Sequence, residues 1–342
     1  MNFSLVFFSV LMKCIRYKIT HSDYDCIMKL IPNLNKTDLY DEIIKNPDFL
    51  CLIELREETE HRKEIKIIKL DNIDPETGNN IIPALFCEIS DIKRLILSNL
   101  KFSKLPNQFE EFQELEFLDL SNNKFKEFPQ VLFSLPKLKV LYLYNNELVT
   151  ISSEIVQMNS LETLSIGYCS GLIDICPNLF KLKNLKELDL SFNCLLFKNN
   201  DFVTCSAYSD DKVSIENENN DENSNNYTDF ASYKSLKKLI IHDNNLSVFL
   251  KFFCNFINLE ELNISDNLFE EIPHELHSFV NLRILDISCN HIKNLIIRNG
   301  MFNNLSKLYL DSNEITELSI SDNALQNLKT LNLSCNKFSK TR

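Results

Sequence analysis

Two histidines close together, His274 and His277 in the segment PHELH, are the first candidates for metal binding or proton transfer. A zinc-binding helix places its histidines four residues apart, so that both imidazoles reach one ion. Here they are three residues apart, and the segment follows a predicted strand. We therefore interpret them as a surface pair and predict no metal site.

The eleven cysteines are odd in number and scattered, without a C-x-x-C pair and without a cluster at either end of the chain. This pattern favours free thiols in a reducing compartment. The four glycines leave no place for a Gly-rich loop that cradles a phosphate. The sequence thus predicts no catalytic residue, no cofactor and no small-molecule substrate.

The composition is that of an acidic repeat domain, with 44% apolar residues, 25% charged residues and a net charge of -12. Neutralising phosphate groups requires clustered Lys and Arg. We therefore predict that neither nucleic acid nor an anionic membrane is a partner.

A leucine pattern recurs at a near-constant step of 23 residues, and the unit that begins at Leu115 reads LEFLDLSNNKFKEFP. A fixed period of this size is typical of stacked repeat proteins, in which neighbours cover the apolar face of each unit. The ten units begin at Ile92, Leu115, Leu138, Leu161, Leu185, Leu236, Leu259, Leu282, Leu305 and Leu328.

This pattern resembles the leucine-rich repeat family, whose core reads L-x-x-L-x-L-x-x-N-x-L. Several units end as the intracellular Ras-group type does, at Leu105-Pro106, Phe128-Pro129 and Ile272-Pro273. The resemblance implies an α/β solenoid, a leucine-rich repeat horseshoe with a parallel β-sheet on its concave face. It also implies that this face binds a protein.

The alternation within L-x-x-L-x-L predicts a short strand with one buried face in every repeat. An asparagine closes the strand where the chain turns off the sheet. Its amide can satisfy buried backbone groups and form a ladder from repeat to repeat. Repeat 1 has Leu100 in this place and repeat 4 has Cys169; the ladder asparagines are Asn123, Asn146, Asn193, Asn244, Asn267, Asn290, Asn313 and Asn336.

The outward positions of repeats 2 to 5 are rich in aromatic side chains, which are the usual energetic centre of a protein interface. The alternative is that exposed aromatics are ordinary in a chain with 25 Phe and 10 Tyr. We predict a partner-binding site formed by Phe117, Asp119, Val140, Tyr142, Tyr144, Tyr168, Glu187, Asp189 and Phe192.

Asp119 and Asp189 fall in one strand column, three repeats apart, or about 14 Å at the usual strand spacing. This is too far for paired-carboxylate chemistry. Repeats 6 to 9 carry mixed charge on the same face, which either adds orientation and specificity or is a plain solvated surface. The residues are Lys237, Lys238, His242, Asp243, Glu260, Glu261, Asp266, Arg283, Asp286, Cys289, Lys307, Tyr309 and Asp311.

Residues 1–64 precede the repeats. Their apolar run, Phe3 to Met12, is too short to span a bilayer and lacks the charge order and cleavage site of a secretory signal. From residue 22 to residue 55 the spacing is helical, which predicts a helical capping region over 1–64. A strand over residues 65–70 begins a degenerate repeat at 65–91. Membrane association or secretion through the apolar run is the alternative.

Two further interruptions stand out. Residues 198–232 hold eight acids and two lysines, which predicts a disordered acidic insertion. It is either a tolerated insertion or a docking or phosphorylation segment. The chain stops at Arg342 without a capping helix. A bare strand edge there predicts self-association through a second copy, a missing C-terminal segment, or a frayed end.

Together these patterns predict a non-enzymatic protein-binding scaffold in intracellular signalling, located in the cytoplasm. The partner's identity is not readable from the residues, because fold alone does not fix function. The alternatives are a regulatory or targeting subunit of a catalytic protein, in a phosphatase or small GTPase pathway, or the repeat segment of a larger enzyme.

Overall fold

The computed structural model describes residues 50–57, 63–71, 93–105, 107–169, 171–173, 175–195, 232–249 and 251–338. The chain forms two compact units, residues 1–169 and residues 170–342. Both are built from the same turn of chain, a three-residue strand followed by a bend and a return segment. All ten predicted repeats contribute such a strand.

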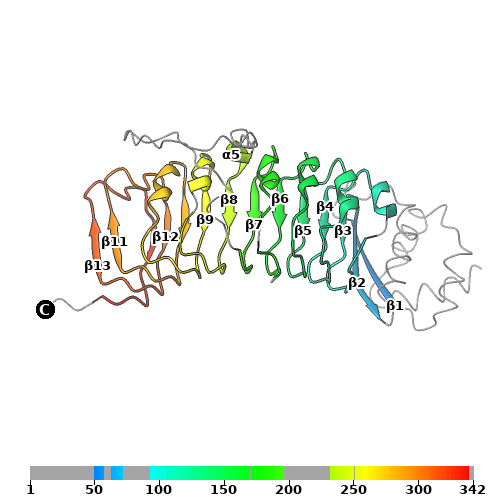
Figure 1. Ribbon diagram of the computed structural model, residues 1–342, viewed down its shortest axis with the longest axis horizontal. Coiled ribbons are helices and arrows are strands. Elements are labelled where there is room, and N and C mark those ends of the chain that lie inside the picture. Colours follow the sequence, from blue (N-terminus) through cyan, green and yellow to red (C-terminus); the bar gives the residue numbers. More distant parts are fainter. Residues whose placement is uncertain are drawn as a thin grey trace, which may run out of the picture. The chain divides into compact units, whose positions relative to one another are not determined.

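In the first unit the strands lie side by side in the order β1-β2-β3-β4-β5-β6 (Figure 1). The repeat strands are parallel, and Leu95, Leu118, Leu141 and Leu164 face one another along one row. Their side chains are buried, whereas their strand neighbours are mostly half-buried. The bounds are β3 (Arg94–Ile96), β4 (Phe117–Asp119), β5 (Val140–Tyr142) and β6 (Thr163–Ser165).

An antiparallel strand pair precedes the repeats, β1 (Leu50–Glu57) and β2 (Lys63–Asp71), and β2 pairs with β3 in parallel. The strand predicted over 65–70 is confirmed. The helix predicted over residues 50–55 is wrong, because β1 occupies them; residues 1–49 lie outside the described residues. β2 already covers the edge of the first repeat, and β1 satisfies the backbone groups along the other edge of β2, which a helix cannot do.

In the second unit one sheet runs in the order β7-β8-β9-β10-β12-β14, and β11 pairs with β13 in a second sheet. Repeats 5 and 6 are far apart in the sequence, but their strands are direct neighbours in the sheet, with Leu188 opposite Leu239. The bounds are β7 (Glu187–Asp189), β8 (Lys238–Ile240), β9 (Glu261–Asn263), β10 (Ile284–Asp286), β11 (Asn294–Ile297), β12 (Lys307–Tyr309), β13 (Glu317–Ile320) and β14 (Thr330–Asn332).

Short 3-10 helices form most of the return segments. They are η1 (Asn107–Glu111), η2 (Gln130–Ser134) and η3 (Ser153–Gln157) in the first unit, and η4 (Pro177–Lys181), η5 (Lys251–Asn255) and η6 (His274–Ser278) in the second. Pro129 and Pro273 lie directly before η2 and η6, with φ of -64° and -55°, where a fixed φ favours helix entry. The predicted insertion lies outside the described residues up to 231, and its last residue begins α5 (Ser232–Ser235).

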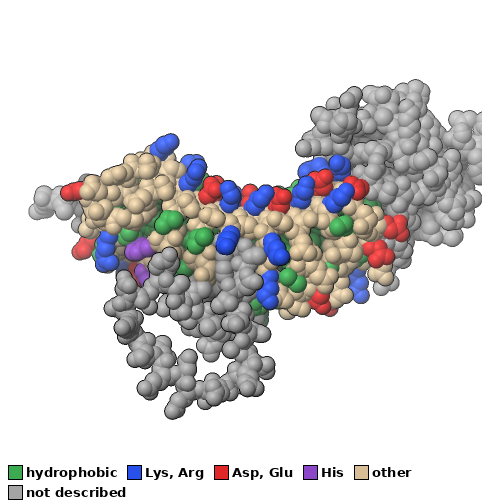
Figure 2. All heavy atoms as spheres, turned by 90° about the horizontal axis from the view of Figure 1, so that it is seen from above, with side chains coloured by type: hydrophobic (Ala, Val, Ile, Leu, Met, Phe, Trp, Pro, Cys, Tyr) green, Lys and Arg blue, Asp and Glu red, His purple; other side chains and the backbone are tan. Residues whose placement is uncertain are grey.

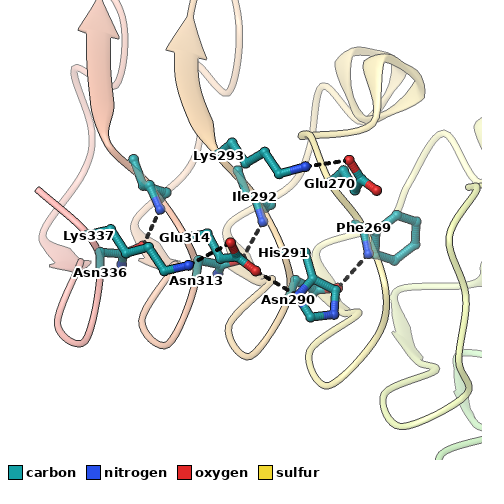
Figure 3. A network of polar contacts seen from close by, with 11 residues as sticks. Phe269, Glu270, Asn290, His291, Ile292, Lys293, Asn313, Glu314, Asn336 and Lys337 are labelled. Carbon is teal, nitrogen blue, oxygen red and sulfur yellow. Dashed lines mark hydrogen bonds and ion pairs between the residues drawn. The ribbon is translucent and has the colours of Figure 1, made fainter.

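The predicted asparagine ladder is present. Figure 3 shows three consecutive members, Asn290, Asn313 and Asn336, whose Oδ1 atoms accept the backbone N–H of Phe269, Ile292 and Ile315. Cys169 fills the same place in repeat 4, with its Sγ 3.8 Å from the carbonyl oxygen of Leu143. Each of these atoms joins one repeat to the one before it, so the ladder couples the turns.

Candidate protein-binding surface

An aromatic row crosses the outward face of β3, β4 and β5. The guanidinium carbon of Arg94 lies 3.8 Å from the ring centre of Phe117. Phe117 in turn meets Tyr142 edge-on, with 5.4 Å between ring centres and 87° between the planes. The pair is diagonal, because Phe117 lies opposite Val140 in the sheet and Tyr142 lies opposite Asp119. Aromatic and cation–π contacts of this kind hold half-buried rings in place.

A second aromatic pair follows the ends of β5 and β6. The rings of Tyr144 and Tyr168 lie 5.8 Å apart, with 30° between their planes. Tyr144 is half-buried, whereas 52% of Tyr168 is exposed. We call Arg94, Phe117, Tyr142, Tyr144 and Tyr168 the aromatic surface.

Tyr168 occupies an unusual backbone position. The residue directly before each ladder asparagine, or before Cys169 in repeat 4, has a positive φ, which is 57° at Tyr168 and 53° at Phe192. In the other repeats this position holds small residues, Asn122, Asn145, Asp243, Asp266, Cys289, Ser312 and Cys335. Asn and Asp visit the left-handed region readily, whereas a bulky ring there costs roughly 1 kcal/mol. The backbone conformation at Tyr168 and Phe192 is therefore unfavourable for an aromatic residue. This cost indicates a role for the two rings other than stabilising the fold.

The two predicted aspartates have a structural task. The carboxylate of Asp119 accepts the backbone N–H of Ser121 at 2.9 Å. Asp189 accepts both the N–H and the hydroxyl of Ser191, at 3.0 and 2.6 Å. These bonds close the bend at the end of the strand. Asp119 and Asp189 therefore serve first to fix the turns beside the aromatic side chains.

The nine predicted site residues are divided between the units. The first unit holds Phe117, Asp119, Val140, Tyr142, Tyr144 and Tyr168, and there the structure brings the aromatic rings together. The second unit holds Glu187, Asp189 and Phe192. Phe192 is 37% exposed, and its ring stands edge-on to His242 with centres 4.5 Å apart.

The prediction missed Arg94, although its position could have indicated it. Arg94 lies one period of 23 residues before Phe117, in the same strand column. It lies in repeat 1, whereas the predicted site covers only repeats 2 to 5. Its charge adds a donor for an acidic or carbonyl group at the edge of the aromatic surface.

Ion-paired side chains flank the aromatic surface. Glu116 lies between Lys93 and Lys139, at 3.6 and 2.8 Å. The hydrogen bond from Lys139 lowers the pKa of the Glu116 carboxyl, and the same contact raises the pKa of Lys139. Figure 2 shows Lys and Arg side chains interspersed with Asp and Glu along one edge of the drawn face. Such rows orient a partner more than they hold it.

The candidates for metal or acid–base chemistry do not converge. His274 contacts the carboxylate of Glu275 at 3.3 Å, and burial lowers the pKa of His277. Within the described residues, no group of three or more His, Cys, Asp and Glu side chains is arranged to hold a metal ion.

Among the helices in the described part of the chain, none has the length and apolar content needed to cross a membrane.

Known proteins share this architecture. The sequence profile of the leucine-rich repeat region matches residues 60–342. No curated protein sequence matches the chain significantly. A solved leucine-rich repeat protein of Leptospira interrogans is similar, with 25% identity and a TM-score of 0.58 over 74% of this chain and 63% of that protein.

The receptor kinase HAESA of Arabidopsis, solved with the peptide hormone IDA and the co-receptor SERK1, is 22% identical, with a TM-score of 0.55. The match covers 74% of this chain and 40% of the HAESA chain. This chain therefore spans less than two thirds of either solved protein. The likeness to HAESA shows the fold alone.

Proposed function

Because the chain belongs to the leucine-rich repeat family, we propose that it is a non-enzymatic scaffold that binds a protein partner through the aromatic surface of its first unit. The observation that carries this proposal is the placement of Tyr168. A half-exposed ring occupies a left-handed backbone position and packs against the ring of Tyr144. Its geometry is unfavourable for folding and favourable for contact with another molecule.

The composition of the surface fits a protein partner. Tyr and Arg are the residue types that are enriched at the energetic centres of protein interfaces. Their mutual contacts fix the rings before binding, so less conformational entropy is lost when a partner arrives. The ion-paired row beside them, Lys93, Glu116 and Lys139, supplies the polar rim of such a surface.

The finer assignment is intracellular signalling in the cytoplasm, with a small GTPase or a phosphatase as the partner. It rests on the resemblance of the Phe128-Pro129 and Ile272-Pro273 endings to the Ras-group repeats. Those prolines also lie directly before η2 and η6. Their structural role explains them without any particular pathway, so the pathway needs its own test through the identity of the captured partner.

Affinity capture from the source cell tests the proposal. The bait is the full chain, compared with a Tyr142→Ala, Tyr144→Ala, Tyr168→Ala variant whose folding is confirmed by circular dichroism. The matched control changes three exposed residues of η2 and η3, with Gln130→Ala, Glu154→Ala and Gln157→Ala. We expect a partner that the wild type and the control retain and the tyrosine variant loses. Equal recovery of the partner by all three baits would contradict the assignment of the aromatic surface as the binding site.

A further inference from the structure

A polar groove of about 680 Å³ lies in the second unit, beside the starts of several strands. Its wall includes one asparagine from each of four consecutive repeats, Asn258, Asn281, Asn304 and Asn327. These residues stand directly before the first leucine of their repeats and form a row distinct from the buried ladder.

Each asparagine of the row is fixed by the backbone of the repeat before it. The Nδ2 atom donates to a carbonyl oxygen 24 residues earlier, at 2.8 Å for Asn258, 3.0 Å for Asn281, 2.8 Å for Asn304 and 2.7 Å for Asn327. This bond uses one of the two Nδ2 hydrogens and fixes the amide, so its oxygen faces the groove wall as an acceptor. It accepts hydrogen bonds, such as those from peptide N–H groups. At Asn258 this oxygen also lies 3.4 Å from the Nδ2 atom of Asn281.

The groove is cationic within an acidic protein. Its charged lining consists of Lys234, Lys237, Arg283 and Lys329 against the single acid Glu260, a net charge of +3 from four cations and one anion. Glu260 pairs with Lys237 at 2.9 Å and with Arg283 at 3.7 Å. Within the described part of the chain, Lys234 and Lys329 have no ion-pair partner. Both remain available for an anionic group.

We propose that this groove binds an extended, Asp- and Glu-rich peptide segment of a partner protein. The lining runs over five repeats, about 19 Å at the usual strand spacing, which an extended segment of about six residues spans. Carboxylates would contact Lys234 and Lys329, at opposite ends of the row, and backbone N–H groups would contact the asparagine oxygens between them. Recognition would therefore depend on both charge and N–H donors.

The same observations disfavour a nucleic acid. Duplex DNA carries one negative charge per about 1.7 Å, so three net positive charges over the groove neutralise few phosphates. The asparagine oxygens also require hydrogen-bond donors, which peptide N–H groups supply and phosphate oxygens do not. A peptide brings donors and a lower density of charge.

Fluorescence anisotropy with the full chain tests the proposal. The probe is a labelled twelve-residue peptide of alternating Glu and Ser, compared with a version carrying Gln for Glu and a version with N-methylated serines. We expect binding of the first peptide only, weakened at least tenfold by Lys234→Glu with Lys329→Glu. The matched control, Lys181→Glu with Lys183→Glu, changes two exposed lysines outside the groove and should alter the affinity less than twofold.

Four results would overturn the proposal. Three of them are equal loss in both charge-reversal variants, equal binding of the N-methylated peptide, and equal binding of a single-stranded oligonucleotide of the same charge. A fourth is binding that appears only when the eight acids of residues 198–231 are changed to amides, which would assign the groove to the chain's own acidic segment. Since the groove lies outside the first unit, these results are independent of the tyrosine experiment.

Discussion

The side-chain oxygen of Asn146 accepts a hydrogen bond from the backbone N–H of Phe125, 21 residues earlier in the chain, at 3.1 Å. The amide nitrogen of Asn146 donates to the carbonyl oxygens of Leu120 and Leu143, at 3.1 and 2.8 Å. One buried side chain thus satisfies three backbone groups in two successive repeats. This unit of structure repeats along the ladder and positions the exposed residues beside it.

Replacing Asn146 by Ala should strongly destabilise the protein. The change leaves three buried backbone groups without their partner, and we expect a loss of about 2 to 4 kcal/mol in the free energy of unfolding. Urea denaturation measures it. Asn159→Ala, at an exposed position of the same unit, is the control and should cost less than about 0.5 kcal/mol. Equal effects of the two changes would show that the ladder is not a stabilising network.

Replacing Tyr168 by Asn should separate folding from binding. Asn tolerates the positive φ of this position better than Tyr, so the free energy of unfolding should stay unchanged or rise by up to about 1 kcal/mol. Partner recovery in the capture experiment should fall. The reverse change at the equivalent position of the previous repeat, Asn145→Tyr, should lower stability. A clear loss of stability in Tyr168→Asn would mean that the ring serves the fold.

The ion pair of Glu116 and Lys139 should make stability depend on acid pH. Lys139 donates to Glu116 at 2.8 Å and lowers the carboxyl pKa below its ordinary value of 4.5. The folded state therefore favours the ionised form, so the stabilisation is present in full above pH 4.5 and is lost as the pH falls through the lowered pKa. The stability difference between wild type and Lys139→Met should shrink from pH 7 to pH 3. A difference that stays constant would contradict this assignment.

Cys169 should resist alkylation in the folded protein. Its side chain is fully buried, and burial raises the pKa of the thiol, so both access and thiolate content are low. Cys194 is exposed in the next repeat and serves as the internal comparison. Iodoacetamide labelling followed by peptide mass spectrometry should modify Cys194 at least tenfold faster. Similar rates at the two positions would place Cys169 outside the core.

Most of the repeat architecture could be predicted from the sequence because the 23-residue period constrains every position at once. The strand leucines, the asparagine ladder and the exchange of Asn for Cys169 all follow from it. The strand at residues 50–57 could not be predicted in this way. Its local spacing fits a helix, and the reason for a strand is the backbone edge of β2, with which it pairs while β2 pairs with the first repeat.

The candidate site was predictable only in part. The period identifies Phe117, Tyr142, Tyr144 and Tyr168 as outward residues, but the sign of φ at Tyr168 depends on how the bend closes. Likewise, a row of Asn258, Asn281, Asn304 and Asn327 is visible in the sequence. Its role could not be predicted, because only the folded turns bring each asparagine within hydrogen-bond distance of the carbonyl oxygen 24 residues earlier.

Site-specific photo-crosslinking tests the central claim most directly, by placing benzoylphenylalanine at Tyr144, at Tyr168, or at exposed Gln157 in η3. Irradiation in the source cell, followed by purification and mass spectrometry, identifies what touches each position. We predict one shared partner from positions 144 and 168 and its absence from position 157. The same partner captured equally at position 157, or no partner from either tyrosine position, would contradict the assignment of the aromatic surface as the binding site.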